Sequence, residues 1–235
     1  MKKEEFIKVL NTKGYSYVTE GDKIVVTENN KDINLDNLKT LPSGVEFNNR
    51  GYIGLESLEM IPSGVKFNNK KSIYLYKLVT LPSGVEFNNG GDISLRGLQI
   101  IHSGVEFNNF GFVDLQSLKT IHSNVKFNNK GNVHLYQLKT IPSDVEFNNE
   151  GDVGLASLRT LNPEVKFNNS GYINLESLIS IPPGVEFNNK GDVSSGLFDG
   201  WFRRSKLASK LSIGLVELID NKKLLNIMIK RSVFA

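Results

Sequence analysis

The chain has no cysteine, one tryptophan and three histidines among its 235 residues. The absence of cysteine excludes a disulfide framework, a thiolate metal site and a thiol nucleophile, and it favours a reducing compartment. Long apolar runs are also missing, and none reaches the length that a membrane span requires. The first ten residues, MKKEEFIKVL, are too charged for a secretory signal. We therefore expect a protein with no membrane span.

Net charge is small and unevenly distributed. The formal charge is +3, but residues 196–235 hold eight Lys or Arg against three acids, which leaves 20 basic and 22 acidic residues in the rest. The tail therefore carries about +5 and residues 1–195 about −2. A tail of this size is typical of a solvated helix face. Nucleic-acid binding through this tail is less favoured and stays open as an alternative.

A 20-residue repeat dominates the chain. The motif Val-x-Phe-Asn-Asn occurs eight times without an insertion, from Val45–Asn49 to Val185–Asn189. A fixed period of this size indicates a solenoid, in which each repeat is a rung that buries its apolar side only against its neighbours. We therefore predict a mainly β protein, a β-solenoid or leucine-rich-repeat-like stack of eight to nine rungs.

Aligning the rungs gives columns of equivalent residues, six of which are apolar throughout. The Val and Phe columns are two residues apart, as are the next two, and this period-two spacing predicts two short strands per rung with alternate side chains inward. The remaining apolar columns predict an extended third side. The six columns begin at Leu41, Val45, Phe47, Ile53, Leu55 and Leu58.

Polar columns occupy the turns and the outward positions. Recurring glycines, Gly51 among them, and Pro-Ser-Gly corners predict turns, and the two Asn columns predict a ladder of stacked amides. The column between Val and Phe pairs opposite charges at six of its seven neighbouring steps, so we interpret it as an outward charge ladder. Its members are Glu46, Lys66, Glu86, Glu106, Lys126, Glu146, Lys166 and Glu186.

The two ends depart from the repeat and predict caps. Residues 1–30 form the expected N-terminal cap: a helix over residues 2–11, then a hairpin of residues 15–18 and 23–27. Val25 and Asn29 are 20 residues before the Val and second Asn columns, so we expect them in those columns. Residues 31–195 form the repeat domain. Residues 196–235 are expected to form a basic cap of two amphipathic helices, with a separate partner-binding or membrane-surface element as the alternative.

Candidates for chemistry are few. His102 and His122 should lie one rung apart, but zinc needs three or four ligands and no further ligand is evident nearby. No phosphate loop, nucleophile elbow or pair of catalytic acids is present. We therefore predict no catalytic residue, no metal site and no cofactor, and hence no enzyme.

The rung sequence resembles known repeat families. Leu-x-x-Ile-Pro-x-Gly-Val-x-Phe-Asn-Asn-x-Gly-x-Val-x-Leu looks like the leucine-rich-repeat-like tandem arrays encoded in many bacteriophage genomes, and residues 222–231 are similar to their tails. The resemblance covers residues 25–231 and implies no established activity. It implies a location in the cytoplasm of the host cell or, alternatively, in the virion. Leu58-x-x-Ile61-Pro62 also resembles bacterial leucine-rich repeats, so a curved horseshoe and a compact β-solenoid both stay open.

The function we predict is protein recognition or scaffolding by a monomer with an unidentified protein partner. A structural part of a virion or cell surface is an alternative class. The outward side of the Ile-x-Leu strand varies freely between rungs and carries residue types that are enriched in binding hot spots. β-Surfaces also favour aromatic residues for reasons of packing alone. The candidate residues are Tyr52, Tyr74, Tyr76, Arg96, Phe112, His134, Tyr136 and Tyr172.

Overall fold

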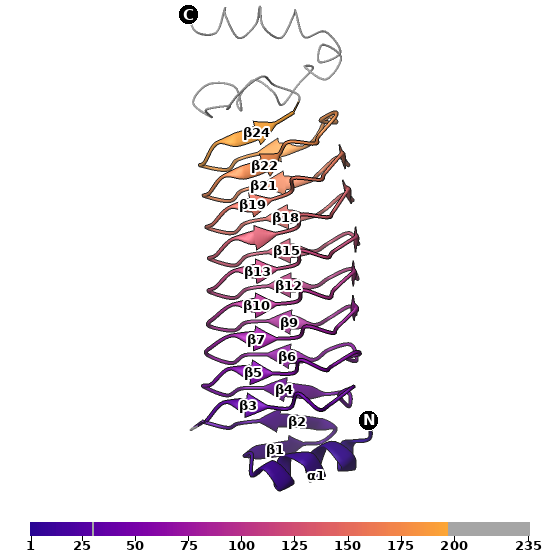
Figure 1. The fold of residues 1–235 in the computed structure, drawn as a ribbon, viewed down its shortest axis with the longest axis vertical. Helices are drawn as coiled ribbons and strands as arrows, with labels where there is room; N and C mark the ends of the chain where they lie inside the picture. Colours follow the sequence, from indigo (N-terminus) through magenta and orange to yellow (C-terminus); the bar gives the residue numbers. More distant parts are fainter. Residues whose placement is uncertain (30, 197–235) are drawn as a thin grey trace, which may run out of the picture.

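The rungs stack into a straight parallel β-solenoid of about nine turns (Figure 1). The structure is a computed structural model that describes residues 1–29 and 31–196. Each full turn contributes one strand to each of two long sheets, whose neighbours are 20 residues apart in the sequence. The predicted stack of 20-residue rungs is therefore confirmed as a straight solenoid, and the predicted helical cap over residues 196–235 lies almost wholly outside the described residues.

Sheet A contains ten strands and carries the Val-x-Phe motif. Only its first pair, β1 with β2, is antiparallel. In order, its strands are β1 Tyr17–Glu20, β2 Lys23–Val26, β4 Val45–Phe47, β6 Lys66–Phe67, β9 Glu86–Phe87, β12 Glu106–Phe107, β15 Lys126–Phe127, β18 Glu146–Phe147, β21 Lys166–Phe167 and β23 Glu186–Phe187.

Sheet B contains nine parallel strands and carries the Ile-x-Leu motif. Its strands are β3 Ile33–Asn34, β5 Ile53–Gly54, β7 Ile73–Tyr74, β10 Ile93–Ser94, β13 Val113–Asp114, β16 Val133–His134, β19 Val153–Gly154, β22 Ile173–Leu175 and β24 Val193–Ser195. The third side is only partly paired, into two short parallel sheets. These comprise β8 Thr80–Leu81, β11 Ile100–Ile101 and β14 Thr120–Ile121, then β17 Thr140–Ile141 and β20 Thr160–Leu161.

The core is a set of stacked columns. Phe rings from Phe47 to Phe187 lie 5.0–5.4 Å apart between centroids, with interplanar angles of 3–7°. The two ladder positions behave differently. The first Asn of each pair donates to the amide oxygen of the preceding rung at 2.7–3.0 Å, as in Asn128 to Asn108. The second Asn is buried and donates to the backbone of its own turn, as in Asn129 to the Gly131 carbonyl. The predicted ladder of amides is therefore formed by the first Asn column, whereas the second column bonds the turn backbone.

Two glycine columns serve two different physical needs. Gly44, Gly64, Gly84, Gly104 and Gly184 have positive φ angles, and in the same column Asn124, Asp144 and Glu164 also adopt them. A positive φ favours glycine because a side chain there crowds its own backbone. The glycines of the column that contains Gly131 instead contact the backbone of the preceding rung. A Cβ added to any of them would lie within 3 Å of a backbone atom of that rung. Close approach of rungs, rather than a turn conformation, favours glycine in this column, in which Lys71 is the one residue with a side chain between Gly51 and Gly191.

The N-terminal cap consists of helix α1 (Lys3–Lys13) and the β1–β2 hairpin. Phe6 and Leu10 of α1 are buried, and Gly14 ends the helix with a positive φ. A hairpin is present as predicted, but its first strand is Tyr17–Glu20 instead of residues 15–18. Strand β2 is also the first rung because it pairs in parallel with β4. Among the described residues, no helix is long and apolar enough to cross a membrane.

The predicted register of this first rung is wrong by one residue. Ile24, not Val25, pairs with Val45, and Val26 pairs with Phe47. This register puts Ile24 and Val26 into the two inward positions, whereas the predicted one would place the polar Thr27 in the Phe column. Glu28 consequently takes the buried position of the second Asn, and the predicted Asn29 is exposed.

The charge column has the predicted register. Every member faces the next one along sheet A, including the like-charged step from Glu86 to Glu106. Within the described residues, two steps of this column close into ion pairs, Lys66–Glu86 at 2.8 Å and Lys126–Glu106 at 3.7 Å. The hydrogen bond from Lys66 to Glu86 raises the pKa of the Lys66 ammonium group.

This register predicts unequal effects for two charge reversals. Lys126→Glu would place a third carboxylate between Glu106 and Glu146, so we expect the free energy of unfolding to fall by about 0.5–2 kcal/mol. Glu106→Lys would lose its attraction to Lys126 but gain one to Glu86, so its expected effect is near zero. Denaturant unfolding of both variants tests this expectation. Equal denaturation midpoints for the two variants would mean that charges in neighbouring rungs of this column do not interact.

Candidate functional site

The candidate site is the outward face of sheet B, which we call face B. Alternation along each strand buries Ile93 and Leu95 and leaves the residues before, between and after them pointing outward. All eight predicted residues occupy these outward positions, and none of them is buried. The sequence therefore placed them on one face correctly, while their role in binding stays a prediction.

Cluster 1 consists of Tyr52, Tyr74 and Tyr76. Tyr74 on β7 lies in the middle, with its ring centroid 5.9 Å from that of Tyr52 and 5.8 Å from that of Tyr76. The first contact is edge-to-face and the second is tilted, arrangements that aromatic rings favour. Partial burial raises the pKa of the Tyr76 phenol, and the Glu56 carboxylate adds to the increase.

Cluster 2 consists of Phe112, His134 and Tyr136. His134 on β16 is the central ring, 5.9 Å from Phe112 and 5.1 Å from Tyr136 between centroids, with interplanar angles of 25° and 21°. Tyr136 extends over the next rung, where a Cβ on Gly154 would lie 2.5 Å from its ring. The absence of a side chain at Gly154 therefore leaves the space that the Tyr136 ring occupies.

Arg96 lies between the two clusters in the sequence. Its side chain is held by Asp114, which the sequence pattern did not indicate as a site residue. Its Nε donates to Oδ2 of Asp114 at 2.9 Å, which raises the pKa of the guanidinium. The Asp114 side chain is only 8% exposed, whereas that of Arg96 is 60% exposed. Arg96 and Asp114 are 18 residues apart, as are Tyr136 and Gly154. This offset is the signal that could have revealed both contacts.

Tyr172 does not join either cluster. Its hydroxyl donates a hydrogen bond to Oγ of Ser194 on the last described rung. Elsewhere on the surface, His102 and His122 stack with ring centroids 5.0 Å apart, which confirms their predicted proximity. Among the described residues, no group of three or more His, Cys, Asp or Glu side chains is arranged to hold a metal ion.

Face B is acidic as well as aromatic. Its outward positions from residue 32 to residue 196 hold a single cation, Arg96, against eight carboxylates, so the face carries a formal charge of −7 with histidine neutral. Several of these acids also cap the backbone, as when Oδ1 of Asp92 accepts from the Phe112 amide at 3.0 Å. The eight carboxylates belong to Asp32, Asp36, Glu56, Asp92, Asp114, Asp152, Glu176 and Asp192.

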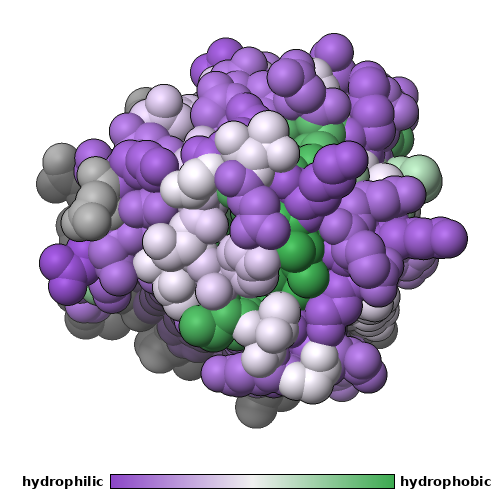
Figure 2. Space-filling view, turned by 90° about the horizontal axis from the view of Figure 1, so that it is seen from below, coloured by the Kyte–Doolittle hydropathy of each residue, from purple (hydrophilic) through white to green (hydrophobic). Residues whose placement is uncertain are grey.

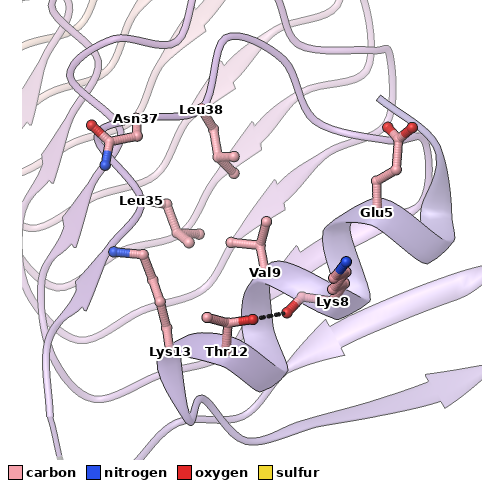
Figure 3. A pocket seen from close by; sticks show the side chains of 8 residues that line it. All are labelled: Glu5, Lys8, Val9, Thr12, Lys13, Leu35, Asn37 and Leu38. Atoms are coloured by element: carbon pink, nitrogen blue, oxygen red, sulfur yellow. Dashed lines mark hydrogen bonds between the residues drawn. The ribbon is translucent and has the colours of Figure 1, made fainter.

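A separate pocket of about 390 Å³ lies between α1 and the first rungs (Figure 3). Val9, Leu35 and Leu38 line it with apolar groups, and charged side chains such as Lys13 project at its rim. Seen from this end, the molecule shows apolar groups in the middle of a largely hydrophilic surface (Figure 2). The lining offers no converging set of polar groups that would select a ligand.

Comparison with known proteins does not assign the chain to a family. No protein-family model matches it, and no curated protein or solved structure is significantly similar to it. The resemblance to phage-encoded arrays is therefore supported only for the architecture, a parallel solenoid of 20-residue rungs with Asn and Phe ladders. Neither a family nor a phage origin is identified.

Proposed function

We propose that the protein is a non-enzymatic protein-recognition or scaffolding module that binds its partner through face B. The observation that supports this proposal is the gathering of outward-facing, partly or fully exposed aromatic residues from separate rungs into clusters 1 and 2. Tyrosine and arginine dominate binding hot spots because they bury large areas and still offer polar groups. Here such residues lie on the outward side of sheet B, whereas the inward residues of the same strands are uniformly aliphatic.

The rigidity of the solenoid also favours binding at this face. Both strand-paired sheets hold each rung against the next, as in the 2.8 Å hydrogen bond from the Val133 amide to the Asp152 carbonyl. The aromatic side chains are therefore positioned before a partner arrives, which lowers the entropy that binding must overcome. A scaffold of this kind needs no movement to present its surface.

We expect affinity capture from the native host cell to depend on face B. Tyr74→Ala, Tyr76→Ala and Tyr136→Ala should each weaken capture of the partner by about tenfold or more, because each removes a ring from a cluster. The unfolding midpoint of each variant should stay close to that of the parent protein, since outward residues contribute little to stability. Capture is quantified by immunoblotting or mass spectrometry across a dilution series.

Matched controls come from sheet A. Glu46→Ala and Lys166→Ala change outward positions of the charge column and should leave capture unchanged. Deleting residues 196–235 tests the alternative site in the basic tail. Capture that survives all three tyrosine changes but is lost with the tail would reject face B and favour the tail.

A further inference from the structure

Aromatic residues recur on face B at an interval of three rungs, a period that is absent from the core columns. Residues 60 apart correspond: Tyr52 with Phe112, Tyr74 with His134, and Tyr76 with Tyr136. The intervening rungs carry smaller or charged residues at these positions. Clusters 1 and 2 are therefore two copies of one set of positions on the same face, about 14 Å apart at roughly 4.8 Å per rung. Their ring geometries differ, with interplanar angles of 66° and 52° in cluster 1 and of 25° and 21° in cluster 2.

The contacts within the two copies correspond as well. In each cluster the central ring, Tyr74 or His134, contacts a ring 22 residues earlier and a ring two residues later. In each, the position 18 residues after the last ring holds a small residue, Ser94 or Gly154. The same period reaches Tyr172, whose contact 22 residues later is with Ser194 rather than with a ring. Ser194 and Gly196 occupy the other two positions of this third copy, so the described residues of face B contain two copies with all three rings.

The charge of the face indicates what these sites accept. The outward positions carry a formal charge of −7, which Lys71 partly offsets by pairing with Asp32 at 3.9 Å, and the remaining negative charge attracts cations. Aromatic rings attract cations through their faces, and arginine suits such sites because its planar guanidinium stacks on rings and pairs with carboxylates. Arg96 shows the carboxylate part of this chemistry within the chain, since its guanidinium pairs with Asp114.

We propose that clusters 1 and 2 are equivalent subsites for two arginine side chains of one extended, basic segment of the protein partner. In an extended chain of about 3.4 Å per residue, about four residues span the distance between the subsites. Side chains four residues apart in such a chain also point to the same side. Arginines at positions i and i+4 therefore reach both clusters, and arginines at i and i+3 do not. This inference rests on the proposed function of face B.

Synthetic peptides test the spacing directly. One 12-residue Gly-Ser peptide carries two arginines four residues apart, and a second of equal composition carries them three residues apart. Titration into the full-length protein with fluorescence anisotropy should give a dissociation constant about tenfold lower for the first peptide, because only it occupies both subsites. A third peptide with glutamates in place of the arginines should not bind.

Three variants locate the two subsites. Tyr76→Ala and Tyr136→Ala should each abolish the preference for the four-residue spacing, since either change leaves a single complete subsite. Phe110→Ala removes an exposed ring that lies outside face B, and it should leave the preference intact. Unfolding midpoints of the three variants show whether each remains folded. Equal affinity for both arginine spacings, or a preference that survives Tyr76→Ala and Tyr136→Ala, would overturn the proposal.

The peptide result and the capture result separate the two proposals. Peptides that bind without a spacing preference, together with capture that still depends on Tyr74, would overturn the paired arginine subsites and leave face B as the recognition surface. Capture that is independent of the tyrosines would overturn the recognition surface itself.

Discussion

Phe127→Ala is expected to lower the free energy of unfolding by about 3–5 kcal/mol. The Phe127 ring is fully buried and lies between Phe107 and Phe147, with 5.1 Å between centroids on each side. Removing it would leave a cavity in the middle of the stack. The cavity cannot collapse because backbone hydrogen bonds hold the spacing of the rungs, as in the 2.7 Å bond from the Asn148 amide to the Phe127 carbonyl.

A second phenylalanine provides the control for this measurement. Phe110 is 62% exposed at a corner, where its ring contacts the ammonium group of Lys130. Phe110→Ala should therefore change stability by only about 0.5 kcal/mol. Both variants are compared by denaturant unfolding. Equal losses at Phe110 and Phe127 would mean that the stacked column does not dominate the core.

Gly131→Ala is expected to destabilise the protein by about 3 kcal/mol, at the upper end of what overpacking costs. A Cβ on Gly131 would lie 2.5 Å from both the Gly111 carbonyl carbon and the Phe112 amide nitrogen. These are backbone atoms of the preceding rung, so the two rungs would have to separate. Separation would lengthen the hydrogen bond from the Gly131 amide to the Gly111 carbonyl, which is already 3.2 Å.

Gly104→Ala isolates the contribution of backbone conformation. Gly104 has a φ of +76°, and a Cβ there would meet nothing within 4 Å. The expected loss is the strain of a left-handed residue, about 1–2 kcal/mol. Thermal and denaturant unfolding of the two alanine variants should rank Gly131 above Gly104. The reverse order would show that conformation, rather than close approach of rungs, decides which glycines are required.

The interior of the protein could be predicted well from the sequence. Period-two spacing placed Val105 and Phe107 inward on one strand and Ile93 and Leu95 inward on another, and all four are fully buried. A strict 20-residue period also predicted that equivalent residues stack, which the register of Glu106 against Lys126 confirms. These features follow from the alternation of apolar and polar residues along each strand and from the 20-residue repeat. Both patterns can be seen directly in the sequence.

The first rung could not be predicted in the same way. Counting back 20 residues from Val45 indicates Val25, but the structure pairs Ile24 with Val45. The choice depends on which register fills the inward Phe position with an apolar side chain, and that comparison involves a neighbouring strand. A similar limit applies to the glycines, because the sequence does not show that the column of Gly131 touches backbone on the preceding rung.

By itself the sequence determined the stacking unit, the buried columns and the set of residues that face outward from sheet B. Only the tertiary structure decided which of those outward residues meet. The contacts of Tyr52 with Tyr74, of Phe112 with His134 and of Arg96 with Asp114 all join adjacent rungs diagonally. The physical reason is that an outward side chain leans across the sheet by an amount set by its rotamer and by the space on the next rung. Gly154 provides that space for Tyr136, and no periodicity within a single rung encodes it.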